Sequence, residues 1–382
     1  MYSFSFQNPT RIEFGVGKEQ NIGAYMQEFG VKKALLVYGS ERIKQSGLFD
    51  DVAASLQANG IEWVELGGVK SNPILSKVKE GIALARQHGV DSILSVGGGS
   101  CLDSAKAIAA GALYDGDVWD FFIGKAAVEQ NLPIFDIITL AATGSEMNNG
   151  GVVMNEQTQQ KYAVNGKDLF PKVSVINPKL QATVSRDYLV YSAADIIAHS
   201  IEGYFTASVQ PEIINMQIEA NIKTVIRTTE ILLNNPNDLD ARGEFAWAAT
   251  MALNGLTYVG THGFSYPNHM IEHALSAICD VPHGAGLSVV MPAWMTWYKE
   301  QNRPQFERFA REIFGLKTAE EGIAALKAWF DKIGTPTTLA QLGVNDEQLA
   351  AVIDNAVQNA VAWQMNETYT QVAITEVFEL AK

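Results

Sequence analysis

The stretch ILSVGGGSCLDSAK, residues 93–106, has the clearest structural pattern in this chain. A short apolar run at residues 93–96 leads directly into three glycines at residues 97–99, and Ser100 then begins an alanine-rich segment with helical spacing. Glycines let a backbone approach a ligand closely and adopt positive φ, and the N–H groups at the start of a helix favour an anion. The segment therefore predicts a strand, a phosphate-binding loop and a helix.

The same loop also has a plainer interpretation. Its spacing is not G-x-G-x-x-G and it does not follow the first strand, and Ser100 with Asp103 fits a capping box that needs no ligand. A second small-residue loop, AATGSE at residues 141–146, follows another apolar run. This second loop could also be a simple N-cap turn at Thr143 or Ser145 that binds no ligand. Two such loops on neighbouring strands would share the carboxyl edge of a sheet, which favours a dinucleotide.

The two halves of the chain have different patterns. Strands are expected at residues 34–39, 61–66, 93–96, 134–140 and 173–177, with helices between them at residues 48–59 and 75–88. This alternation predicts a parallel sheet covered by helices. After residue 179 helices are expected at residues 187–207, 211–234, 240–258, 267–278, 305–314, 319–333 and 346–359. We therefore expect an α/β dinucleotide-binding domain over residues 1–179 and an all-helical metal-binding domain over residues 180–382.

Composition and charge narrow the classes of partner. The formal net charge of −14 over 382 residues makes nucleic acid an unexpected partner. The sequence has no basic segment ahead of an apolar one at its start and no apolar run of membrane-spanning length, so neither a signal peptide nor a membrane span is expected. Cys101 and Cys279 fit no paired motif, which is typical of reduced thiols in a cytoplasmic protein. Residues 3–6 and 11–14 are expected to form an edge hairpin where the chain could self-associate.

Four of the six histidines gather between residues 261 and 283. Asp195 and His199 are four residues apart in an expected helix, so they share one face, and His269 and His273 stand in the same relation. His283 follows in an expected turn, V-P-H-G. A carboxylate with imidazoles and no thiolate pair suits Fe²⁺ or Zn²⁺. Spacing alone leaves open whether these segments face one cavity or form only local ion pairs.

Together the motifs resemble the iron-containing (group III) alcohol dehydrogenases, in particular their butanol dehydrogenase and broad aldehyde reductase branch. The resemblance covers nearly the whole chain through NPTRIEFG, GGGSCLDSAK, ATGSE, DIIAHSIEGY, NHMIEHALSA and PHGAGLSVVMPAW. It implies the dehydroquinate synthase-like fold, with an N-terminal domain that binds a nicotinamide cofactor and a C-terminal helical domain that binds iron, or zinc as a second choice.

The resemblance also implies roles for individual residues. The implied metal ligands are Asp195, His199, His269 and His283. The expected cofactor contacts are Gly39, Ser40, Gly97, Gly98, Gly99, Ser100, Asp103, Thr143, Ser145 and Lys161. His273 lies at a position near the metal where it could relay a proton or orient a ligand, and Asn148 lies at a position close to the substrate.

The implied activity is hydride transfer between NAD(P)(H) and a short-chain primary alcohol or aldehyde, with the metal acting as a Lewis acid. After the first main strand, Gly39 leaves room for a 2′-phosphate and Arg42 could pair with it, whereas Glu41 opposes it. This turn favours NADP(H) over NAD(H). We also expect the chain to form a homodimer.

Three other assignments remain open at this point. They are a zinc polyol dehydrogenase of the glycerol type, a dehydroquinate synthase-like lyase and a non-catalytic ligand-binding protein on the same fold. The carboxylate with three histidines favours the iron-type enzyme.

Overall fold

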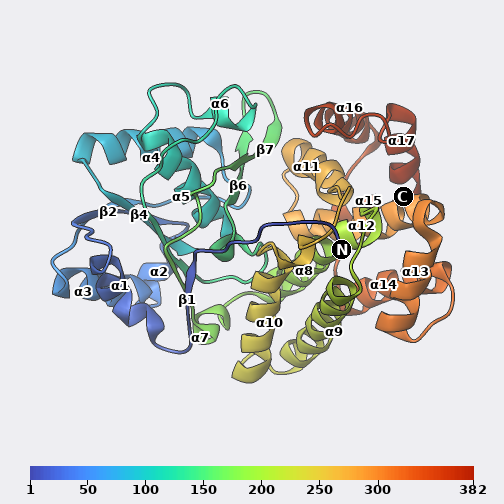
Figure 1. Cartoon of the computed structure of the whole chain (residues 1–382), viewed down its shortest axis with the longest axis horizontal. Coiled ribbons are helices and arrows are strands. Elements are labelled where there is room, and N and C mark those ends of the chain that lie inside the picture. Colours follow the sequence, from blue (N-terminus) through green and yellow to red (C-terminus); the bar gives the residue numbers. More distant parts are fainter. The chain divides into compact units, whose positions relative to one another are not determined.

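The computed structural model describes residues 1–382 and contains two compact units, Gln7–Val184 and Met1–Phe6 together with Ser185–Lys382 (Figure 1). The first unit is built on a parallel six-stranded sheet in the order β1-β8-β5-β4-β2-β3. Its strands are β1 (Arg11–Phe14), β2 (Lys33–Tyr38), β3 (Glu62–Leu66), β4 (Ser92–Gly97), β5 (Ile134–Ile138) and β8 (Val173–Ile176). The predicted parallel sheet with alternating helices is confirmed.

Helices cover both faces of this sheet because its central strands are apolar on both sides. Leu35 and Leu36, successive residues of β2, belong to two separate hydrophobic cores, one with α4 and α5 and one with α1 and α3. The helices of the unit are α1 (Ile22–Gln27), α2 (Arg42–Gln45), α3 (Leu48–Ala58), α4 (Leu75–His88), α5 (Gly99–Ala112), α6 (Trp119–Phe122) and α7 (Pro178–Gln181), with 3₁₀ turns η1 (Lys18–Asn21) and η2 (Ser145–Met147).

The order of strands reverses between β2 and β4. From β2 the chain first adds β3 on one side and then crosses over to place β4 on the other side. Tyr38 is the register partner of Val96, and Gly97 is the partner of Ile138, so the segments that follow β2, β4 and β5 leave the sheet side by side. Doubly wound sheets bind ligands at such a switch point. The topology therefore explains why the glycine loop does not follow the first strand.

Two details of this unit differ from the prediction. The edge hairpin was wrong, because β1 pairs in parallel with β8, and Tyr2 instead donates its backbone N–H to the carbonyl of Gly260 in the helical unit. The antiparallel pair β6 (Gly150–Asn155) and β7 (Gln160–Asn165) was not predicted. Glycines and polar residues at these positions weaken the alternation on which strand prediction depends.

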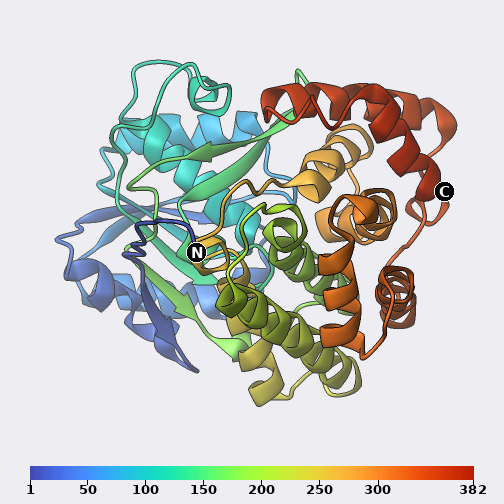
Figure 2. The ribbon, with the colours of Figure 1, turned by 45° about the vertical axis from the view of Figure 1, so that its right-hand side comes forward.

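The second unit is helical, as predicted, and Figure 2 shows its helices in the colours from green to red. They are α8 (Arg186–Thr206), α9 (Glu212–Asn234), α10 (Leu239–Ala252), α11 (Pro267–Cys279), α12 (His283–Tyr298), α13 (Arg303–Phe309), α14 (Ala319–Ile333), α15 (Leu339–Leu342), α16 (Asp346–Ala362) and α17 (Gln371–Leu380), with short turns η3 (Leu256–Tyr258), η4 (Lys299–Asn302) and η5 (Ala310–Phe314). None of the helices has both the length and the hydrophobicity needed to cross a membrane.

Helix α12 is the main element that the sequence pattern did not predict, because His283 was expected in a turn and is instead its first residue. The helix is apolar on all sides and contains Pro292, so no polar face gives it a periodic pattern. It packs against α8, α11, α14 and α17. Gly284 allows the close contact with α8, since a Cβ there would lie 2.1 Å from the carbonyl oxygen of Tyr191. This packing brings His283 close to α8.

Candidate metal centre and cofactor-binding loops

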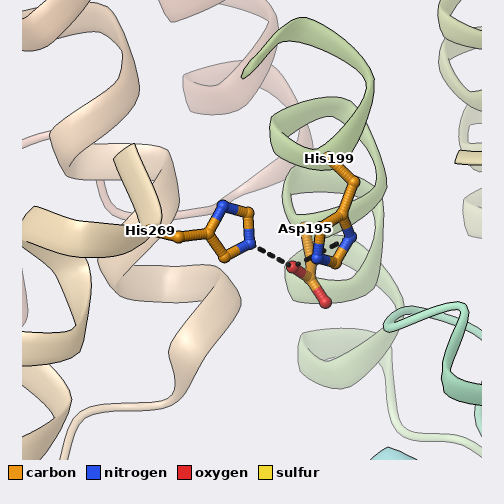
Figure 3. Close-up of side chains that lie close together, drawn as sticks. All are labelled: Asp195, His199 and His269. Carbon is orange, nitrogen blue, oxygen red and sulfur yellow. Dashed lines mark ion pairs between the residues drawn. The ribbon is translucent and has the colours of Figure 1, made fainter. Parts of the chain in front are cut away.

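Asp195 on α8 lies at the centre of a cluster of imidazoles (Figure 3). Its Oδ1 is 3.5 Å from His199 Nδ1, 3.5 Å from His269 Nε2 and 3.6 Å from His283 Nε2. Asp195 and His199 share a face of α8, whereas His269 lies in the first turn of α11 and His283 begins α12. The structure thus brings together, from three helices of one unit, the four residues named as ligands.

The atoms that face each other in this cluster suit a bound cation. Asp195 Oδ1, His199 Nδ1 and His269 Nε2 are buried and have no hydrogen-bond partner, a state that costs about 1–3 kcal/mol for each group. Burial alone would raise the pKa of Asp195, but the histidines around it hold that pKa well below its ordinary value. Burial lowers the pKa of His199 to about 3. An ionised carboxylate and a neutral imidazole both offer lone pairs, so these residues fit a divalent ion such as Fe²⁺ or Zn²⁺.

Two more carboxylates, which the sequence analysis left without a role, contact the far side of the imidazole rings. Glu202 Oε1 accepts a hydrogen bond from His269 Nδ1 at 2.8 Å, and Glu272 Oε2 contacts His283 Nδ1. Burial opposes protonation of His269, yet the carboxylates of Asp195 and Glu202 raise its pKa to about 9. Glu202 follows Asp195 by seven residues on the same face of α8, so helical spacing could have found it. The contact of Glu272 with His283 depends on the packing of α12, which the sequence did not predict.

Aromatic rings stand around the imidazoles. His273 lies one turn after His269 on α11, and its ring centre is 5.6 Å from that of His283. Trp363 meets the His273 ring edge-on at 5.3 Å, and Tyr266 meets the His269 ring edge-on at 6.1 Å. Aromatic rings therefore form part of the surroundings of the candidate metal centre, beside the two buried carboxylates.

The glycine loop begins α5 without a side-chain cap. The N-cap is Gly98, and Ser100 lies inside the first turn, so the alternative capping box with Asp103 does not form. The expectation of positive φ was also wrong, because none of the glycines at residues 97–99 has it. Glycine is needed at position 99 for space, since a Cβ there would lie 2.5 Å from the side chain of Thr143. First-turn N–H groups without a cap are suited to binding an anion.

Gly39 and Ser40 follow β2 next to this loop. A Cβ on Gly39 would lie 3.7 Å from Cys101 Sγ of α5, which confirms how closely the segments after β2 and β4 approach each other. Lys161, on β7, is buried and its Nζ donates to Asn72 Oδ1 at 3.2 Å. Apart from Lys161, the predicted cofactor contacts thus follow three adjacent strands of the sheet.

Lys106 connects α5 to the loop after β5, and the sequence analysis did not identify it. Its buried Nζ donates to the carbonyl oxygens of Ser145 (2.7 Å), Asn148 (2.9 Å) and Gly150 (2.7 Å), and it also donates to Ser145 Oγ and Asn148 Oδ1. Asp103 accepts from Ser145 Oγ at 2.8 Å. The structure therefore places the side chains of Asp103 and Asn148 inside a buried polar network. A lysine within an alanine-rich buried helix was the available signal.

A doubly wound sheet with an uncapped glycine loop at the start of α5, followed by a helical unit with an Asp–His cluster, fits a metal-dependent, nicotinamide-linked dehydrogenase. Residues 9–178 match the family model for iron-containing alcohol dehydrogenase. Residues 189–382 match the model for the C-terminal part of the Fe-containing alcohol dehydrogenase family. The chain belongs to the iron-containing alcohol dehydrogenase family and is an oxidoreductase.

Similar proteins cover the chain almost completely. A probable NADH-dependent butanol dehydrogenase of Bacillus subtilis is 38% identical over 95% of this chain and 96% of its own length. An NADPH-dependent aldehyde reductase of Escherichia coli is 29% identical over 97% and 96%. The crystal structure of an NADH-dependent butanol dehydrogenase from Thermotoga maritima superposes with a TM-score of 0.97 at 45% identity, covering 100% of this chain and 99% of that one. The resemblance inferred from the motifs is confirmed.

The buried network predicts the effect of replacing Lys106. Lys106→Met removes the cation shared by the oxygens of Ser145, Asn148 and Gly150, and breaking a buried charged cluster costs about 3–5 kcal/mol. We expect a lower midpoint of thermal unfolding and weaker binding of NADH or NADPH, measured by nucleotide fluorescence. Lys79→Met, which removes an exposed lysine, is the matched control. Equal midpoints and affinities in the two variants would show that the network does not hold the loop.

Proposed function

We propose that this chain transfers a hydride between NAD(P)(H) and a short-chain primary alcohol or aldehyde at a divalent cation held by four residues. The ligands would be Asp195, His199, His269 and His283. The observation that carries the proposal is the convergence of one carboxylate oxygen with three imidazole nitrogens. The family favours iron, and these nitrogen and oxygen donors would also accept zinc.

The residues of the chain would bind the cation and the cofactor, orient them and hold the proton. When bound, the cation supplies Lewis-acid chemistry and the nicotinamide supplies or accepts the hydride. The first turn of α5 would hold the pyrophosphate, with Lys161 as a further cofactor contact. His273 would hold the proton that the alcohol releases. Asn148 would act by shaping its loop, because its side chain already bonds Lys106 and the carbonyl oxygen of Gly144.

Aromatic surroundings support a small apolar substrate. Tyr266 and Trp363 stand edge-on to the candidate ligand His269 and to His273, so they would exclude water from an alkyl chain. Relatives named butanol dehydrogenase and aldehyde reductase agree with short-chain alcohols and aldehydes. A glycerol-type zinc polyol dehydrogenase is the second candidate, because the donor set also suits zinc. Turnover of glycerol in preference to butanol, with zinc and not iron, would favour it.

Cofactor choice depends on the charges after β2. Arg42 is exposed, so it could turn toward a 2′-phosphate. Glu41 would repel that phosphate, but its carboxylate is 3.4 Å from Lys44 Nζ, and the positive charge of Lys44 offsets the negative charge of Glu41. We therefore propose a preference for NADP(H), although the two NADH-dependent butanol dehydrogenases are more similar to this chain than the NADPH-dependent reductase.

We propose a homodimer because the chain has an unpaired sheet edge and exposed aromatic side chains. Strand β1 is an edge of the sheet, with one side unpaired. Tyr2, Phe4 and Phe6 are about half exposed, at 51%, 52% and 45%, in a chain segment without helix or strand. A second copy could either pair with the edge of β1 or cover these rings. The cytoplasmic location and the functional boundary at residue 179 stay predictions.

Metal binding is the first test of the proposed function. His269→Ala and Asp195→Asn each remove a ligand, so we expect loss of bound iron and a fall in kcat of about 100-fold or more, as for loss of a dominant electrostatic group. Metal content is measured by mass spectrometry and kcat with butanol. His88→Ala, at an exposed position, should keep both. Full metal content and turnover in the two ligand variants would refute the assignment.

Initial rates with the two cofactors test the preference. The native chain should show a higher kcat/KM with NADPH than with NADH, and Arg42→Ala should lower only the NADPH value, by about 10-fold, the loss of roughly one charge-assisted hydrogen bond. A native preference for NADH, with no effect of Arg42→Ala on NADPH, would assign NADH to this chain.

Light scattering tests the dimer. Native protein should have twice the mass of the chain, and the triple variant Tyr2→Ser, Phe4→Ser, Phe6→Ser should shift toward monomer because it removes the apolar contact area. A monomeric native protein would contradict the proposal.

A further inference from the structure

The carboxylates behind the imidazoles belong to two buried residues, Glu202 on α8 and Glu272 on α11. Glu202 and Glu272 are both fully buried, and each contacts the Nδ1 atom of a different candidate ligand histidine. In both His269 and His283 the opposite ring atom, Nε2, faces Asp195. We propose that Glu202 and Glu272 are positioning residues that fix these imidazoles and strengthen their bonds to the cation. The inference rests on the proposed metal centre and deepens it.

Glu202 contacts both the ring of His269 and the backbone at the start of α11, the helix that carries it. Its Oε1 accepts from both the backbone N–H and the ring Nδ1 of His269, at 3.0 and 2.8 Å. Its Oε2 accepts from the side chain of Asn268 at 3.1 Å. Helix α11 has no side-chain cap of its own, so Glu202 satisfies an N–H group that the first turn would leave unpaired. The ring cannot turn away from Asp195 without breaking this arrangement.

Glu272 makes the equivalent contact to His283 from α11 toward α12. Its Oε1 also accepts from Ser276 Oγ, so both carboxylate oxygens are engaged. Gly286 provides the space for this carboxylate, since a Cβ there would lie 2.7 Å from Glu272 Oε1. Because Glu272 is engaged in this way, its proximity to His273 and His283 fits an outer carboxylate better than a ligand of a second cation.

The chemistry of an imidazole ligand gives these contacts their effect. A carboxylate that accepts the Nδ1 proton leaves the lone pair on Nε2 and makes that nitrogen a stronger donor. The ion-pair partners of Asp195 and of Glu202 are all imidazoles, so neither carboxylate is neutralised by a lysine or an arginine. Their negative charge raises the affinity of the cluster for a divalent cation.

The test measures binding of Co²⁺ to metal-free full-length protein, followed by visible absorbance of the bound ion. Glu202→Gln and Glu272→Gln keep the size and an acceptor oxygen but remove the charge, and each should weaken Co²⁺ binding by about 10–100-fold. Glu202→Ala also removes the acceptor and should bind more weakly still. Gly286→Ala should weaken binding by displacing Glu272, without changing any ligand or carboxylate. The absorbance bands should shift, because the ligand field changes.

Glu219→Gln is the matched control, since Glu219 is a buried glutamate that bonds Tyr204 and Arg308 away from the cluster. It should lower the midpoint of thermal unfolding while leaving Co²⁺ affinity and absorbance unchanged. Native affinity and native bands in folded Glu202→Gln and Glu272→Gln would overturn the inference while leaving the metal centre intact. If the native chain itself bound no Co²⁺, Fe²⁺ or Zn²⁺, the proposed function would fail and this inference with it.

Discussion

The carboxylate of Asp195 is the group around which the candidate metal centre is built. It is buried, its Oδ1 has no hydrogen bond, and every charged group that it meets is an imidazole. An ionised carboxylate in such a place is costly unless a positive charge accompanies it, and removing one partner of a buried pair costs several kcal/mol. A divalent cation meets that requirement, and it also gives the unpaired imidazole nitrogens a partner.

Small residues let the helices come close enough to build the cluster. Gly284 permits the contact of α12 with α8, and Gly286 leaves room for Glu272. In the α/β unit Gly99 has the same role, because it accommodates the side chain of Thr143 beside the start of α5. Glycine serves at all three positions by its lack of a Cβ and not by an unusual backbone angle. Close packing therefore explains glycine at positions 99, 284 and 286.

Much of this structure could be predicted from the sequence. Helices α4 and α14 were predicted with their bounds because amphipathic spacing and capping residues mark them. The convergence of Asp195 with three histidines could be expected because the Asp195–His199 spacing is local and the family motifs are specific. Helix α12 was missed because a helix buried on all sides has no polar face. Glu272 and Lys106 were missed because their partners lie far away in the sequence and are set only by tertiary packing.

X-ray absorption spectroscopy at the iron edge of the iron-loaded protein identifies the atoms that bind the cation. With Asp195 and three imidazoles as ligands, the first shell should contain three nitrogen donors and an oxygen donor at about 2.0–2.2 Å, with the outer-shell scattering of imidazole rings, and no sulfur at about 2.3 Å. A first shell that contains sulfur, or one without imidazole scattering, would contradict the account.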